Sequence, residues 1–354
     1  MPICYMKYSV IVPVFNRPDE VSELLDSLTH QTVTDFEVVI VEDGSQVPCK
    51  EVCEAYADRL NLHYYAKTNS GPGQSRNYGA SVAQGEYLLI LDSDVVLPEG
   101  YLKAIDDELN REPADAFGGP DCAHESFTPV QKAISYSMTS FFTTGGIRGG
   151  KKKLDKFYPR SFNMGIRSDV YHALGGFSKM RFGEDIDFSI RIFKAGYRCR
   201  LFPEAWVWHK RRTDFMKFWR QVYNSGIARI NLYMKYPESL KLVHMLPMVF
   251  TVGVFLLVIL GIIGIVNLAF GQNSMQHAVG FWACTFAATP LLLYSLLIFI
   301  GSTLKNKSLQ VGALSIIAAF IQLMGYGFGF LEAVWKRMVL QKDEFSAYEK
   351  NFYN

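Results

Sequence analysis

Residues 87–100, "YLLILDSDVVLPEG", decide the fold of this 354-residue chain. An apolar run ends in Asp92 and Asp94, which stand on either side of Ser93. In an extended segment, residues i and i+2 point to the same face, so both carboxylates enter one small volume. Two carboxylates held this close repel each other unless a cation compensates. The segment therefore predicts a buried strand with a cation site at its end; the alternative is a surface turn with two solvated aspartates.

Strands and helices alternate around this segment. The apolar strand segments are "YSVIVPVF", "FEVVIVEDGS" and "LHYYAK", and the helical segments that follow them are "NRPDEVSELLDSLTHQ", "KEVCEAYADRL" and "GPGQSRNYGASVAQ". Asn16 is expected to cap the first helix, with Pro18 in its first turn. This alternation indicates an α/β fold, Rossmann-like, with a mostly parallel sheet flanked by helices on both faces. Ligands bind beyond the carboxyl ends of such strands, so we expect the acidic residues of "VEDGS" and "LDSD" to cluster there.

Three long apolar stretches occupy residues 245–270, 279–301 and 309–335, and Glu332 is the single charged residue in them. A helix needs about 20 apolar residues to cross a bilayer, so we expect two or three C-terminal transmembrane α-helices. The alternative is long core helices of a soluble protein. Lys305 and Lys307 follow the second stretch, which the positive-inside rule assigns to the cytosolic side. A third crossing would place "KRMVLQKDEF" outside, so the third stretch either crosses or is re-entrant.

Two further segments bear on the membrane. Within residues 214–235, aromatic residues fall on one stripe of a predicted helix, and basic residues accompany them. This pattern is typical of a helix that lies in the lipid headgroup region. The alternative is a helix packed on the α/β domain. The stretch "TTGGIRGGKKKLDKFYPR" reads as a loop, and its residues Lys151, Lys152 and Lys153 either guide an anionic lipid or form a solvated charge run.

Composition excludes some classes of protein. The formal net charge of +2 argues against a partner that is a nucleic acid. The cysteines have no zinc-like spacing, which suits free thiols in a reducing cytosolic domain. The N-terminus has no secretory pattern, because its first apolar run is short and contains Pro13. We therefore expect a multi-pass protein of the cell (inner) membrane whose α/β domain faces the cytoplasm.

Six motifs occur in a characteristic order. They are "SVIVPVFN", "VVIVEDGS", "GPGQSRNYGA", "GEYLLILDSD", "FNMGIRSDVYHALGGF" and "GEDIDFSIRIFKAGY". Together they resemble the family 2 glycosyltransferases of the GT-A fold, over roughly residues 8–233. The resemblance implies a GT-A catalytic domain in residues 1–213. The apolar and basic patterns described above divide the rest of the chain into an amphipathic interfacial helix and linker in 214–243, two or three transmembrane helices in 244–335 and a polar tail in 336–354.

The resemblance also implies a nucleotide-sugar donor, a UDP-sugar by preference, and a Mg²⁺ or Mn²⁺ cofactor. Transfer from such a donor needs a stabilised diphosphate, which a hard cation provides by bridging its oxygens. Asp94 is expected to ligate the metal, Asp92 to support the metal or the ribose, and His209 to complete the metal shell or contact the diphosphate. The residues expected to bind the nucleotide sugar are Pro13, Asn16, Glu42, Asp43, Arg76 and Asp92.

The acidic cluster "GEDID" opens a helix and implies the catalytic base. Asp185 is expected to take the proton from the acceptor hydroxyl, with Glu184 as the second candidate. One base opposite the leaving group implies a single displacement with inversion. Asp187 is expected to pair with Arg191 four residues later and to be structural. The residues expected on the acceptor or diphosphate side are Asn163, Met164, Lys210 and Arg211.

Processive members of the family carry a Q-x-x-R-W motif, and this chain has "FWRQVYNSG" instead. The sequence therefore favours addition of one sugar per encounter, to a lipid-linked or glycan acceptor, in cell-surface polysaccharide or glycolipid synthesis. Two other functions stay open. One is a membrane transporter or scaffold with a non-catalytic nucleotide-sugar-binding domain, and the other is a nucleotidyltransferase.

Overall fold

The computed structural model describes residues 6–122, 127–144, 157–180, 182–210 and 212–347. These residues belong to two compact units. The α/β unit comprises Met1–Glu125 and Lys152–Lys210, and the helical unit comprises Ser126–Lys151 and Arg211–Asn354. The helical unit therefore takes one segment from inside the sequence of the α/β unit.

A seven-stranded sheet forms the centre of the α/β unit, in the order β3-β2-β1-β4-β8-β6-β9. The strands are β1 (Tyr8–Val14), β2 (Phe36–Asp43), β3 (Leu62–Lys67), β4 (Tyr87–Leu91), β6 (Ala116–Gly118), β8 (Asn163–Arg167) and β9 (Cys199–Leu201). β3, β2, β1 and β4 are parallel, whereas β8 is antiparallel to β4 and β6. A smaller sheet has the order β5-β10-β7, from Val95–Val96, Val207–His209 and Asp121–Cys122. The predicted mostly parallel α/β fold is confirmed.

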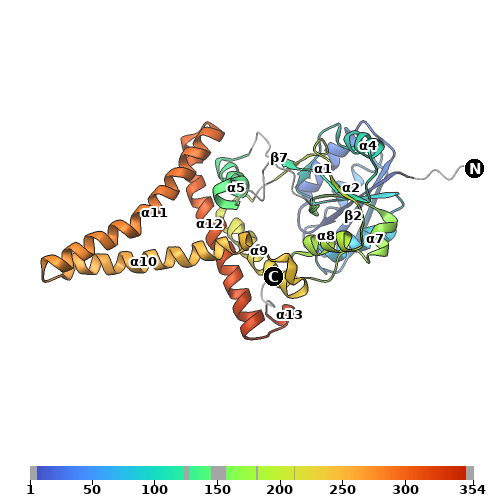
Figure 1. Cartoon of the computed structure of the whole chain (residues 1–354). Helices are drawn as coiled ribbons and strands as arrows, with labels where there is room; N and C mark the ends of the chain where they lie inside the picture. Colours follow the sequence, from blue (N-terminus) through green and yellow to red (C-terminus); the bar gives the residue numbers. More distant parts are fainter. Residues whose placement is uncertain (1–5, 123–126, 145–156, 181, 211, 348–354) are drawn as a thin grey trace, which may run out of the picture. The chain divides into compact units, whose positions relative to one another are not determined.

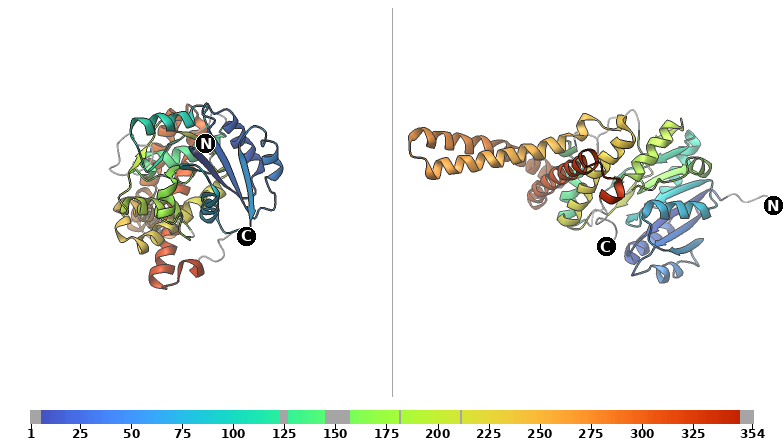
Figure 2. Two further views of the ribbon diagram at one scale, coloured as in Figure 1. Left: turned by 90° about the vertical axis from the view of Figure 1, so that its right-hand side faces the viewer. Right: turned by 90° about the horizontal axis from the view of Figure 1, so that it is seen from below.

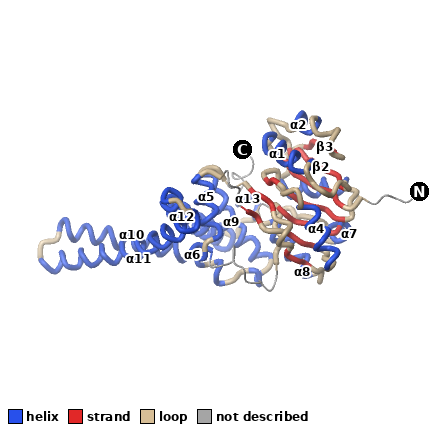
Figure 3. Tube along the Cα trace, turned by 90° about the horizontal axis from the view of Figure 1, so that it is seen from above, coloured by secondary structure: helices blue, strands red, loops and turns tan. Residues whose placement is uncertain are grey.

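Helices cover both faces of the large sheet, as Figure 3 shows. One hydrophobic cluster holds Val10 and Val12 of β1, and the other holds Ile11 between them. This alternation follows from the period of two residues in a strand. The first cluster includes residues of α1 (Pro18–Thr29), α2 (Lys50–Glu54) and α4 (Tyr101–Arg111); the second includes residues of α3 (Pro72–Val82), α7 (Ser168–Ala173) and α8 (Glu184–Lys194).

Two local expectations are wrong. Asn16 does not cap α1: it has a positive φ of 55°, and its Oδ1 accepts hydrogen bonds from the backbone N–H of Gln46 and Val47 instead. The second helix is shorter than its pattern predicts, because α2 ends at Glu54. Beyond it the backbone forms tight i to i+3 turns that bring Tyr56 into the core.

The helical unit contains three helices that are long and apolar enough to cross a membrane. They are α10 (Leu246–Phe270), α11 (Ser274–Asn306) and α12 (Leu309–Ala333), which continues into the π-helical turn η3 (Val334–Val339). The other elements are α5 (Pro129–Thr139), α6 (Phe141–Thr144), α9 (Phe215–Lys235), η1 (Pro237–Ser239), η2 (Leu242–His244) and α13 (Glu344–Ala347). The predicted apolar C-terminal helices are confirmed.

Close packing joins α10 to α11 through small residues. A Cβ atom added to Gly264 would lie 2.8 Å from the backbone nitrogen of Cys284, and one added to Gly280 would lie 2.9 Å from the carbonyl oxygen of Gly264. Small residues at such an interface let two backbones approach closely. The right-hand view of Figure 2 shows α10 and α11 running side by side as a hairpin. α12 also packs on α5 and α9, with Ile134, Phe218 and Ala318 in one buried cluster.

Candidate active site

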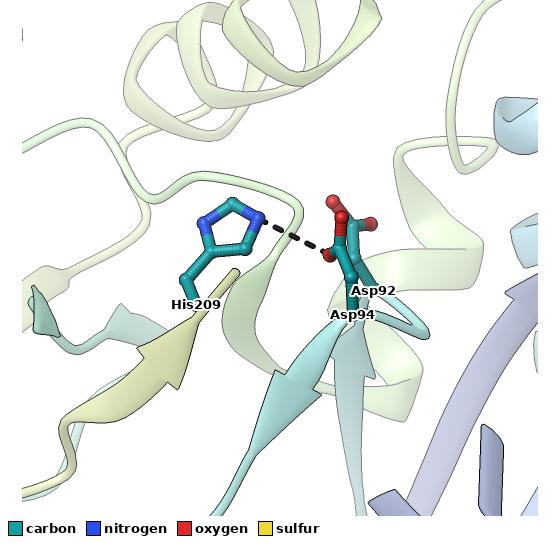
Figure 4. Close-up of side chains that lie close together, drawn as sticks. All are labelled: Asp92, Asp94 and His209. Atoms are coloured by element: carbon teal, nitrogen blue, oxygen red, sulfur yellow. Dashed lines mark ion pairs between the residues drawn. The ribbon is translucent and has the colours of Figure 1, made fainter. Parts of the chain in front are cut away.

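Asp92, Asp94 and His209 meet beyond the end of β4. One ligand atom of each lies within 4.8 Å of the others, and His209 Nε2 is 3.2 Å from Asp94 Oδ1. The sheet explains this meeting: β4 ends at Leu91, directly before Asp92, and β10 pairs antiparallel with β5 so that His209 stands opposite Val95. Figure 4 shows the two carboxylates and the imidazole turned toward one another from separate strands.

This donor set fits a divalent cation. Two carboxylates and one imidazole are ligands that Mg²⁺ and Mn²⁺ accept in proteins. Neighbours orient the imidazole: its ring stacks on Phe162 with centroids 4.7 Å apart, and its Nδ1 lies 4.0 Å from Asp121 Oδ2. At 4.0 Å this contact with Asp121 is too long for a hydrogen bond, so it is the stacking on Phe162 that holds the ring. Asp121 lies on β7, the strand that pairs with the other side of β10.

Arg76 on α3 joins this metal cluster to the second acidic cluster. One of its terminal nitrogens, NH2, lies 2.8 Å from Asp92 Oδ1, and the other, NH1, lies 3.3 Å from Glu184 Oε1. The side chain is only 4% exposed and lies over the ring of Phe177. Burial alone would lower the pKa of Arg76, but the charges of Asp92 and Glu184 hold that pKa above its usual value. A permanent cation therefore lies between the two acidic clusters.

Glu184 and Asp185 occupy the first turn of α8, after Gly183 at a φ of 87°. A glycine adopts this left-handed backbone without steric cost, so the chain can turn sharply into the helix. Burial raises the pKa of Glu184, and Asp185 adds to this effect while Arg76 opposes it. Asp185 Oδ2 is 3.3 Å from Arg160 NH1, so a guanidinium lies beside this carboxylate.

Asp187, one turn further into α8, is fully buried. It accepts hydrogen bonds from Arg191 Nε at 3.0 Å and from Ser178 Oγ at 2.6 Å. The predicted Asp187–Arg191 pair is confirmed, and it holds α8 to the preceding loop.

Glu42 and Asp43 at the end of β2 hold the neighbouring loops together. Glu42 accepts a hydrogen bond from the backbone N–H of Cys49 at 2.7 Å. Asp43 accepts from the N–H groups of Ser70 and Gly71 at 2.9 and 2.8 Å, just before α3. Both carboxylates are almost fully buried, and Pro13 pairs with Val41 on the adjacent strand. These contacts place Arg76 on α3 relative to the strand ends.

The residues expected on the acceptor side have other neighbours. Asn163 Oδ1 accepts from Tyr101 Oη at 2.7 Å, and its Nδ2 donates to the carbonyl of Ala205 at 2.8 Å. Met164 is fully buried within the sheet. Lys210 Nζ lies 2.6 Å from Glu23, while its backbone N–H donates to the carbonyl of Asp94. The structure thus brings the backbone of Lys210, but not its side chain, to the metal cluster. Arg211, Lys151, Lys152 and Lys153 lie outside the described residues.

Two arginines at the site were missed from the sequence. Arg17 NH1 lies 3.4 Å from Asp94 Oδ2 and also contacts Glu20. Arg160 contacts Asp185. The available signals were their positions: Arg17 stands between Asn16 and the charged pair Asp19 and Glu20, and Arg160 stands just before "SFNMGIR".

A family model described as glycosyl transferase family 2 matches residues 9–175. TarS of Staphylococcus aureus, a poly(ribitol-phosphate) beta-N-acetylglucosaminyltransferase, is 43% identical over 102 residues, which are 28% of this chain and 18% of TarS. GlyG, a glycosyltransferase of Streptococcus pneumoniae, is 33% identical over 31% of this chain and 38% of its own length. An uncharacterized glycosyltransferase of Haemophilus influenzae is 32% identical over 52% of this chain and 62% of its own length.

A solved structure shares the fold at low identity. The mannosyltransferase PcManGT from Pyrobaculum calidifontis, in complex with GDP-Man and Mn²⁺, has a TM-score of 0.56 and 16% identity, covering 95% of this chain and 89% of that one. The chain spans less than two fifths of the length of TarS and GlyG. The match to residues 9–175 agrees with the sheet order and with the position of the two aspartates that follow β4. Residues 9–175 of this chain, which include Asp92 and Asp94, therefore resemble glycosyl transferase family 2.

Proposed function

We propose that this chain is a metal-dependent inverting glycosyltransferase. It moves a sugar from a nucleotide-sugar, a UDP-sugar by preference, to a hydroxyl or phosphate of a lipid-linked or glycan acceptor. The observation that carries the proposal is Arg76, which contacts Asp92 of the metal cluster and Glu184 of the second acidic cluster. Leaving-group chemistry and acceptor chemistry thus share one site.

Each cluster has its own part in the reaction. Asp92, Asp94 and His209 would hold Mg²⁺ or Mn²⁺, which when bound stabilises the oxygens of the departing diphosphate. Asp185 takes the proton from the acceptor hydroxyl as that oxygen attacks the anomeric carbon. Arg160 orients the Asp185 carboxylate. With one base and no second nucleophilic carboxylate in this role, the sugar is transferred in a single displacement with inversion.

The residues at the end of β2 support the donor. Asp43 and Glu42 fix the loops on either side of the strand end, where Pro13, Asn16 and Arg76 are proposed to receive the nucleotide. The apolar helices associate the protein with a membrane, which suits an acceptor carried by a lipid or a growing surface glycan. One sugar is added per encounter, in polysaccharide or glycolipid synthesis on the cytoplasmic face.

The test is release of nucleoside diphosphate by the full chain in membranes, with Mn²⁺ and a panel of donors and acceptors. Asp185→Asn is expected to abolish release while calorimetry shows that donor binding is retained. Asp94→Ala is expected to abolish the Mn²⁺-dependent part of donor binding. Asp107→Asn is the matched control, because Asp107 is exposed on α4 and pairs with Lys103 four residues earlier. Full turnover by Asp185→Asn contradicts the assigned base, and no turnover by the wild type with any pair favours a scaffold.

A further inference from the structure

The three apolar helices are not equivalent in their packing. In the most apolar part of α10 and of α11, 11% of the residues are buried, whereas in α12 the share is 44%. The buried side of α12 includes Ala318, Ala319 and Phe330. Protein therefore covers more of α12 than of α10 and α11, whose exposed apolar side chains suit contact with lipid.

α12 meets the α10–α11 hairpin at its open end. Its contacts with α10 lie near the start of that helix, where Thr251 Oγ1 donates to the carbonyl of Leu323. Its contacts with α11 lie toward the C-terminal end of α11, where the hydroxyls of Ser302 and Ser315 are 2.6 Å apart. Figure 1 shows α12 crossing the hairpin at the end away from the loop that joins α10 to α11. A third helix that spanned the bilayer beside the hairpin would pack along its length.

α9 runs beside α12 in the same direction. Three pairs mark this contact in chain order: Val222 with Gly325, Tyr223 with Gly329, and Asn231 with Arg337. α9 also carries Arg220 and Arg229 in its middle. If α12 crossed the bilayer, Arg220, which this register places beside the middle of α12, would enter the hydrocarbon, where it costs about 2.5–3.5 kcal/mol. At the membrane surface, basic residues on an amphipathic helix are instead favourable.

The positions of the charged residues also distinguish α10 and α11 from α12. Residues 246–304 contain no Lys, Arg, Asp or Glu. Lys241 precedes this interval, and Lys305 and Lys307 follow it directly. The basic residues Lys336, Arg337 and Lys342 come after α12. Two crossings place all of them on one side of the bilayer, as the positive-inside rule requires, whereas three crossings would divide them.

We propose that the described chain crosses the bilayer twice, through α10 and α11, and that α12 lies with α5 and α9 at the membrane surface, against the lipid headgroups. Among the described residues, no apolar helix long enough to cross lies between the α/β unit and α10. With two crossings, the basic residues of both units and η3 are therefore on one side of the bilayer. The residues after α12 therefore return to the side of the α/β unit. This topology does not depend on the proposed glycosyl transfer.

Side-specific thiol labelling of the full chain tests this topology. Gln272→Cys places a thiol in the exposed hairpin loop, and Lys342→Cys places one after η3. The native Cys122 is exposed and marks the side of the α/β unit. Sealed right-side-out and inside-out vesicles are treated with a membrane-impermeant maleimide, and each labelled peptide is identified by mass spectrometry, so the other native thiols can stay.

We expect Cys122 and Lys342→Cys to be labelled from one side and Gln272→Cys from the other. Labelling of Lys342→Cys together with Gln272→Cys would mean three crossings and would overturn the proposal. Labelling of all three thiols from one side would show that the hairpin does not insert, which also overturns it. Activity is not part of the readout, so a failure of the proposed function leaves the result unaffected.

Discussion

Replacing Arg76 by Met removes the cation between the two acidic clusters and keeps most of the side-chain volume. Arg76 is 4% exposed, Glu184 is 18% exposed and Asp92 is 32% exposed. Removing one member of a buried ion pair costs about 3–5 kcal/mol, because the remaining charge stays buried without a partner. Water reaches part of Asp92, so we expect a loss near the lower end, about 3 kcal/mol in the free energy of unfolding of the α/β unit.

The loss depends on pH with a definite sign. Burial already raises the pKa of Glu184, and removal of Arg76 raises it further. A carboxyl group whose pKa is higher in the folded protein than in the unfolded chain destabilises the fold in its ionised form. Its protonation removes that penalty. The stability difference between Arg76→Met and the wild type should therefore be largest at pH 7 and shrink toward pH 5. Adding Glu184→Gln should recover about 1 kcal/mol or more at pH 7.

The assay follows urea-induced exposure of Cys49 and Cys53, which are buried in the α/β unit and report on that unit alone. Arg200→Met is the control, since Arg200 lies 2.7 Å from Glu108 in another partly buried ion pair. Both variants should lose stability, but Arg76→Met alone should lose donor binding at temperatures where the domain is folded. A stability difference that is absent, or the same at pH 7 and pH 5, would refute the reasoning.

Three other predictions concern the helical unit. Gly329→Val should destabilise it by about 1–3 kcal/mol, because the new Cβ would meet the carbonyl of Tyr223, whereas Gly253→Val meets no atom within 4 Å and should be neutral by thermal unfolding in detergent. Ile259→Lys should lower the membrane-inserted fraction and Ile317→Lys should not, although both side chains are about half exposed. Burial and the neighbouring cations lower the pKa of His244 from 6.5 to about 3, so thermal stability should fall below pH 6.5, and His244→Gln should flatten this dependence.

The fold was predictable where local patterns and burial agree. Continuous apolar strands such as "VVIV" need cover on both faces, and the parallel order of β3, β2, β1 and β4 follows. The antiparallel strand β8 was not predictable, because a short apolar run has no direction in the sequence. The end of α2 was missed because Tyr56 is held by tertiary packing, which periodicity does not report.

The site was predictable to the extent that topology brings strand ends together. The spacing of Asp92 and Asp94 is enough to predict that both carboxylates lie on one face of the segment. The partners Arg17 and Arg160 do not, since an isolated arginine has no signal until the fold places a carboxylate beside it. Asn16 was misassigned because an Asn before a helix has two uses, and here its side chain serves the loop after β2.

The family match and the geometry support different halves of the site. Arg76, Asp92 and Asp94 lie inside the matched residues 9–175, whereas Asp185 and His209 lie beyond them. The structure joins the halves through two contacts of different kinds. His209 lies next to Asp94 because β10 pairs with β5. The first turn of α8 is linked to the metal cluster because Arg76, which contacts Asp92, also contacts Glu184. Substitutions within residues 9–175 therefore test what the family already implies. Substitutions of Asp185 and His209 test what this chain adds, and they decide whether its own C-terminal elements complete a working transferase.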